Sequence, residues 1–105
     1  MNVQRLNDSF RRTMGAAVRG RFYLSAGVAA KSDVDRFEII QLVRQFEDFD
    51  KENDPYSEHD FGSFDFRGEK IMFKIDYFAD STLEWGAEDK EDCFRVLTIL
   101  LLTEY

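Results

Sequence analysis

Two runs of alternating residues, Asp60 to Phe66 and Lys70 to Phe78, constrain the fold more than any other feature of this chain. The dipeptide Arg67-Gly68 separates them, and glycine supplies the positive φ that a tight turn requires. The runs therefore predict an antiparallel hairpin in which Asp65 faces Lys70 as a favourable charge pair.

The hairpin also predicts which side chains share a face of the sheet. By the same count, His59 lies opposite Asp76 or diagonal to it, so the two side chains are expected to be neighbours. Lys70, Met72 and Lys74 lie on their face. The buried face is expected to hold six apolar or aromatic residues: Phe64, Phe66, Ile71, Phe73, Ile75 and Tyr77.

Helices and one further strand are predicted on both sides of this hairpin. Apolar residues at three- to four-residue spacing predict a helix from Val3 to Met14, and alternation predicts a strand from Arg21 to Ala26. Ser32 is a good N-cap for a second helix that runs to about Phe46 or Phe49. The buried stripe of that helix is expected to comprise Val34, Phe37, Ile40, Val43 and Phe46, widened by Ile39 and Leu42.

The segment from Cys93 to Leu102 is apolar nearly all round. Its leucine content and length favour a final helix, and a buried strand is the competing interpretation. The order of elements predicts one domain over residues 1–105 of the α+β class. Its architecture is a small antiparallel sheet of three to four strands with two or three helices packed on one face.

The net charge and the cysteine content limit the classes of function and the cellular locations that we expect. The 105 residues carry a net charge of -7, which argues against direct binding to a nucleic-acid backbone. Residues 1–36 carry +4 and the remainder -11. A single cysteine suits a reducing, cytoplasmic location, and no apolar stretch reaches the roughly 18 residues that span a membrane.

Most of the negative charge lies in and after the loop that contains the only proline and the only histidine. An acidic surface of this kind can engage a basic surface on a partner protein through long-range attraction, and exposed aromatic residues add anchors. The aromatic candidates are Phe49, Tyr56, Phe61, Phe78 and Trp85. The predicted partner-binding residues are Asp50, Glu52, Asp54, Tyr56, Glu58, His59, Asp60, Asp76 and Trp85.

Two other classes of function remain open. His59 with Asp76 resembles the orienting half of a general base, and Glu58 and Asp60 extend this into a hydrolase or metal-enzyme hypothesis. No nucleophile accompanies the pair, and two ligands on one face do not complete a metal site, so we assign no catalytic residue, metal or cofactor. The third hypothesis is a self-associating structural module held together by the C-terminal segment.

Several short motifs carry a resemblance to a known family. They are Leu6-Asn7-Asp8, Ala26-Gly27-Val28, Asn53-Asp54-Pro55-Tyr56 with Glu58-His59-Asp60-Phe61-Gly62, Lys74-Ile75-Asp76-Tyr77, Arg95-Val96-Leu97-Thr98-Ile99 and Glu104-Tyr105. The chain resembles the bacterial family known as domain of unknown function 3768, from which it departs at Ser57 and at Lys90-Glu91. The resemblance implies no activity and no site residues, but it does imply a small accessory protein of plasmids and other mobile elements. That setting suggests a protein that inhibits a host defence complex, for example a CRISPR or restriction effector.

Overall fold

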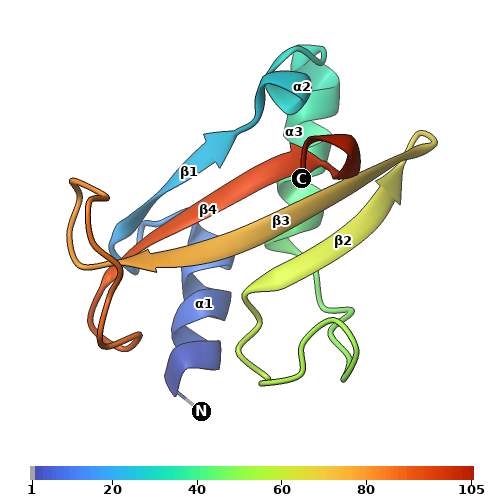
Figure 1. The fold of residues 1–105 in the computed structure, drawn as a ribbon. Helices are drawn as coiled ribbons and strands as arrows, with labels where there is room; N and C mark the ends of the chain where they lie inside the picture. The colour runs from blue at the N-terminus through green and yellow to red at the C-terminus, as the bar shows by residue number, and fades with distance from the viewer. Residues whose placement is uncertain (1) are drawn as a thin grey trace.

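The computed structural model describes residues 2–105, in which four strands form one sheet in the order β1-β4-β3-β2. The strands are β1 (Gly20–Leu24), β2 (Phe61–Phe66), β3 (Glu69–Phe78) and β4 (Phe94–Leu101). The helices are α1 (Asn2–Thr13), α2 (Ala26–Ala29), α3 (Asp33–Arg44) and the short 3-10 helix η1 (Leu102–Glu104). Figure 1 shows α1 and α3 on one face of the sheet, which confirms the predicted α+β class.

The hairpin forms as the alternation predicts. β2 and β3 are antiparallel, Phe66 pairs with Glu69, and Asp65 pairs with Lys70. The Lys70 Nζ lies 3.1 Å from the Asp65 carboxylate. Arg67 and Gly68 have φ of 49° and 85°, the two successive positive values of the turn that matches strand twist.

The core lies between the helices and one face of the sheet. Ile71, Phe73 and Ile75 of β3 are almost fully buried there, as predicted from the alternation. β4 contributes Leu97 and Ile99, which are fully buried. The helices contribute Phe10, Ile39 and Val43, also fully buried.

The C-terminal segment is a strand, so the predicted final helix is wrong. β4 pairs in parallel with β1 and in antiparallel fashion with β3, which makes it a central strand. Its helix-facing side is covered by the core, and Val96 and Leu100 on the other side are 5% and 7% exposed. A strand buried on both faces loses its polar alternation and becomes indistinguishable by periodicity from a buried helix.

The predicted cap of α3 is confirmed, but its predicted buried stripe is too wide. The Ser32 hydroxyl accepts a hydrogen bond from the Asp35 N–H at 3.1 Å. Val34 and Phe37 are 64% and 62% exposed, whereas Ile39 is buried. Each step of three residues turns about 60° around an α-helix, so five such positions span more than one face can bury.

α1 and β1 lie close to where the periodicities place them, but two predicted elements extend too far. The predicted strand included Ala26, which begins the unpredicted helix α2, and α3 ends at Arg44, before Phe46. None of the helices within residues 2–105 has the length and apolarity needed to cross a membrane.

Candidate functional site

Four segments meet at the N-terminal half of α1, and Asn7 connects three of them. The Asn7 side chain is fully buried, and its amide nitrogen donates to the Glu58 carbonyl at 2.9 Å and to the Tyr77 hydroxyl at 2.8 Å. Its amide oxygen accepts from the Arg95 Nε at 2.7 Å. One side chain of α1 therefore ties together the loop before β2, the end of β3 and the start of β4.

Arg95 extends this network to the loop before β4. Its guanidinium is buried, contacts the Cys93 sulfur at 3.3 Å and donates to the Lys90 carbonyl. The guanidinium also lies 5.4 Å from the centre of the Tyr77 ring. Burial raises the pKa of the Tyr77 hydroxyl well above its ordinary value and also raises the pKa of the Cys93 thiol. Both groups therefore stay protonated at neutral pH.

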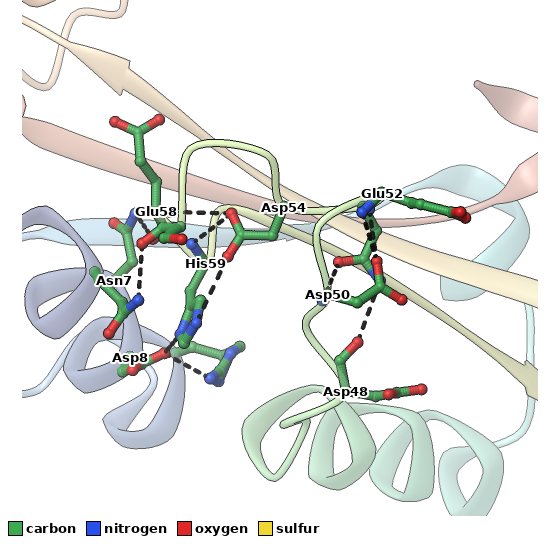
Figure 2. A network of polar contacts seen from close by, with 12 residues as sticks. Asn7, Asp8, Asp48, Asp50, Glu52, Asp54, Glu58 and His59 are labelled. Carbon is green, nitrogen blue, oxygen red and sulfur yellow. Dashed lines mark hydrogen bonds and ion pairs between the residues drawn. The ribbon is translucent and has the colours of Figure 1, made fainter.

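His59 fixes the loop before β2 to α1, as Figure 2 shows. Its Nδ1 lies 2.9 Å from the Asp8 carboxylate, and its Nε2 lies 3.6 Å from the Asp54 carboxylate. The ring stacks on Phe49 with centroids 3.9 Å apart and planes 5° apart. The two carboxylates and the Phe49 ring therefore hold the imidazole in one position, and the imidazole connects the loop to α1.

Asp54 shapes the backbone of this loop from inside. The carboxylate is nearly buried and accepts hydrogen bonds from the Glu58 N–H at 2.9 Å and the His59 N–H at 3.1 Å. These bonds support the positive φ values of Ser57 and His59, 55° and 57°. Asp and Asn commonly close turns by this kind of local bond, which explains the Asn53-Asp54-Pro55 sequence.

The predicted pairing of His59 with Asp76 is wrong. β2 begins at Phe61, and the positive φ at His59 turns the chain away from the ladder before the residue can face β3. The His59 ring turns instead to Asp8. Asp76 forms its ion pair with Lys74 at 2.8 Å.

Arg11 is a second buried guanidinium that the sequence analysis did not single out. It is fully buried, pairs with Asp8 at 3.0 Å, and lies over the Phe49 ring at 5.3 Å and the Phe73 ring at 5.8 Å. Its Nε and Nη1 have no hydrogen-bond partner among residues 2–105. Burial lowers the pKa of Arg11. Its spacing from Asn7 was the available signal, because residues four apart share one face of a helix.

The nine predicted partner-binding residues fall into a buried or half-buried group, an exposed group and one residue apart from both. Asp54, Glu58, His59 and Asp60 are buried or half-buried inside the network. The Glu58 carboxylate is paired with the Lys90 Nζ at 3.1 Å. Burial and the nearby Glu58 raise the pKa of Asp60, which lies 3.4 Å from the Tyr77 hydroxyl. The exposed members are Asp50, Glu52, Tyr56 and Trp85, and Asp76 lies apart on β3.

The surface beside His59 offers limited chemistry. A shallow pocket of about 190 Å³ is lined by Phe49, Asp50, Lys51, Asp54, Ser57 and His59. Within residues 2–105, no three acidic, histidine or cysteine side chains are arranged to hold a metal ion. Phe61 and Phe78 are half-buried, and Phe49 is taken up by the stack with His59, so Tyr56 and Trp85 are the predicted aromatic anchors that stand free of the core.

Comparison with known proteins gives one match. Residues 24–104 match the model of the family described as "Protein of unknown function (DUF3768)". No curated protein and no solved structure matches the chain. The matched range contains the loop before β2 together with Tyr77 and Arg95, and it begins after the α1 residues that hold them. Since the match covers most of the sequence, this chain belongs to the DUF3768 family.

Proposed function

We propose that the protein is a small non-enzymatic binding protein whose acidic surface engages a basic surface on a partner protein. The observation that carries this proposal is the composition of two loops, residues 47–60 and 79–92, which we call the acidic loops. They hold thirteen of the 21 acidic residues and only two of the 14 basic residues.

The acidic loops meet around the start of α1. Gln4 donates to the Ser57 carbonyl at 2.8 Å, and Asn2 donates to the Glu91 carboxylate at 2.8 Å. The Lys90–Glu58 ion pair joins the two loops directly. Side chains from both loops can therefore act on one partner together.

Many carboxylates of the acidic loops remain available to a partner. Figure 2 shows Asp48, Asp50 and Glu52 in a group separate from the network of Asp54 and His59. The exposed acidic residues with no cation within 4.0 Å among residues 2–105 include Asp48, Asp50, Glu52, Glu84, Glu88 and Asp89. Uncompensated charge of one sign steers a partner of the opposite sign, with an attraction that salt weakens.

Each acidic loop also presents one aromatic anchor. Tyr56 is 78% exposed and Trp85 is 71% exposed. Beside Trp85 lies a surface pocket of about 510 Å³ whose wall includes Glu88, Asp89 and Asp92. A lysine or arginine side chain from a partner would find there both carboxylates and the face of an indole ring, the best aromatic acceptor for a cation.

The partner class follows from this chemistry. Proteins that handle nucleic acids carry basic grooves that accept phosphates, and an acidic surface on a small protein can occupy such a groove. We therefore propose a cytoplasmic inhibitor or nucleic-acid mimic directed at a nucleic-acid-processing complex, such as a CRISPR or restriction effector. The mobile-element setting that the family resemblance implies supports this choice by analogy alone.

A salt-graded pull-down from host lysate, with bound proteins identified by mass spectrometry, tests the proposal. One variant neutralises four acidic-loop residues, and the control neutralises four exposed acidic residues elsewhere. The loop variant carries Asp48→Asn, Glu52→Gln, Glu84→Gln and Glu88→Gln. The control carries Asp33→Asn, Glu38→Gln, Asp65→Asn and Glu69→Gln.

We expect wild type and control to retain a nucleic-acid-handling protein at low salt and to lose it as salt rises. The loop variant should lose it under all conditions while remaining folded. Equal recovery by the loop variant and the control would contradict a role for the acidic loops, because both carry the same change in net charge.

A further inference from the structure

We propose that the outer edge of β2 pairs with β2 of a second copy of this chain, forming a two-fold symmetric antiparallel dimer centred on Ser63. β2 is the terminal strand of the sheet, so within residues 2–105 one side of its backbone has no strand partner. Figure 1 shows no helix or strand beyond it on that side. The inference concerns a surface distinct from the acidic loops and does not depend on the proposed function.

The backbone groups that face outward can be identified from the hydrogen bonds on the inner side. The Ile75 N–H donates to the Asp60 carbonyl at 2.8 Å, and Phe66 pairs with Glu69 across the two-residue turn. Hydrogen-bonded pairs alternate along an antiparallel ladder, so even-numbered residues of β2 bond to β3. The N–H and C=O groups of Phe61, Ser63 and Asp65 therefore point outward.

This edge lacks the features that normally prevent strands from pairing. Exposed edge strands are usually protected by lysine, proline, a bulge or inward-pointing charge. β2 reads Phe-Gly-Ser-Phe-Asp-Phe, with Asp65 as its single charged residue. The opposite edge strand, β1, carries an exposed arginine at Arg21. The third hypothesis of the sequence analysis placed self-association at the C-terminal segment. That segment forms β4, which is paired with a strand on each side and offers no free edge to a second copy.

Symmetry and charge select the register. Centring the two-fold axis on Ser63 pairs all three outward residues, with Phe61 opposite the partner's Asp65. Centring it on Asp65 would place two carboxylates directly opposite each other, which is unfavourable.

Cross-linking tests the register. In a hydrogen-bonded antiparallel pair the two Cα atoms lie about 5.5 Å apart, which suits a disulfide. Under mild oxidation we expect Ser63→Cys to form a covalent dimer. The matched control, Asp65→Cys, places its two thiols about 14 Å apart along the strands and should form no covalent dimer. The native Cys93 is buried and does not interfere.

Two further measurements establish whether wild type pairs through this edge. Sedimentation across a concentration series should show a doubling of mass, and Ser63→Lys should weaken the dimer at least tenfold because two lysines then oppose each other. Tyr23→Lys on the other edge strand should not change the dimer. Amide exchange of Ser63 should slow at least tenfold as wild type dimerises, whereas that of Phe64 should not depend on concentration.

Wild type that stays monomeric at millimolar concentration, with Ser63 exchanging at a constant rate, would overturn the proposal. A dimer that persists unchanged in Ser63→Lys would also overturn it, since association would then use another surface. A strand of a different protein bound at this edge, with no homodimer, would likewise refute the second copy as the occupant.

Discussion

Replacing Asn7 by alanine tests whether the network around α1 holds the acidic loops in place. The substitution leaves the Arg95 Nε, the Tyr77 hydroxyl and the Glu58 carbonyl without their present partner. Arg95 is 1% exposed, so its guanidinium has little access to replacement water. The substitution therefore removes hydrogen bonds from groups that cannot readily replace them with bonds to water.

The expected cost follows from these three contacts. A buried donor or acceptor left without a partner costs about 1–3 kcal/mol, and more when it is charged. Local relaxation recovers part of this, so we expect Asn7→Ala to lower the free energy of unfolding by about 3–4 kcal/mol. For a chain of this size that corresponds to a fall in Tm of roughly 12–16 °C.

Urea unfolding followed by far-UV circular dichroism measures this loss. Trp85 is already 71% exposed in the folded protein, so its fluorescence is a poor probe of unfolding. Asn2→Ala is the matched control, because Asn2 lies on the same helix and makes one exposed hydrogen bond to Glu91. The control should change stability by less than about 0.5 kcal/mol. A loss below about 1 kcal/mol for Asn7→Ala would refute the claim that this side chain carries the network.

Two further substitutions test packing and charge. A Cβ added at Gly62 would lie 2.4 Å from the Phe73 ring, so Gly62→Ala should cost about 2–3 kcal/mol in urea unfolding, whereas Gly86→Ala, which meets open space, should be neutral. Asp60→Asn should stabilise the protein by about 0.5 kcal/mol at pH 7, because burial and Glu58 disfavour the Asp60 carboxylate and half exposure screens the effect. Because the folded-state pKa of Asp60 is raised, the folded wild type becomes less stable as pH rises through that pKa. Below about pH 3.9 Asp60 is protonated in both the folded and the unfolded state, so the stability advantage of Asp60→Asn should vanish there. A constant difference between the two proteins from pH 3 to pH 7 would contradict this assignment.

The parts of the fold that were predicted correctly are those in which local pattern and tertiary environment agree. The hairpin from Asp60 to Phe78 buries mainly one face, with Met72 as the buried residue of the other, so most of its alternation survives in the sequence. β4 lies in the middle of the sheet, and both of its faces are shielded from solvent, which removes the alternation that would identify it. Its helical spacing of leucines was therefore compatible with either structure.

The candidate site was predicted less well because its contacts join residues far apart in the chain. The sequence singled out His59, but Asp8 lies 51 positions away. Hydrophobic periodicity carries no information about such pairs. Arg95 had one local sign of burial, since it interrupts an apolar run, but nothing in the sequence identifies Asn7 as its partner.

Some acidic residues support the loop structure and others are free at the surface, so a test of the proposed function must change only the second kind. Asp54 accepts two backbone hydrogen bonds and Glu58 is paired with Lys90, so neutralising them would disturb the loop itself. Loss of partner binding in such a variant would follow equally from lost charge and from lost loop structure. Only the exposed carboxylates, such as Asp48 and Glu52, separate the two causes, because they can lose charge while the network around Asn7 stays intact. A partner that still binds when those are neutral does not recognise the charge of the acidic loops, which would contradict the proposed function.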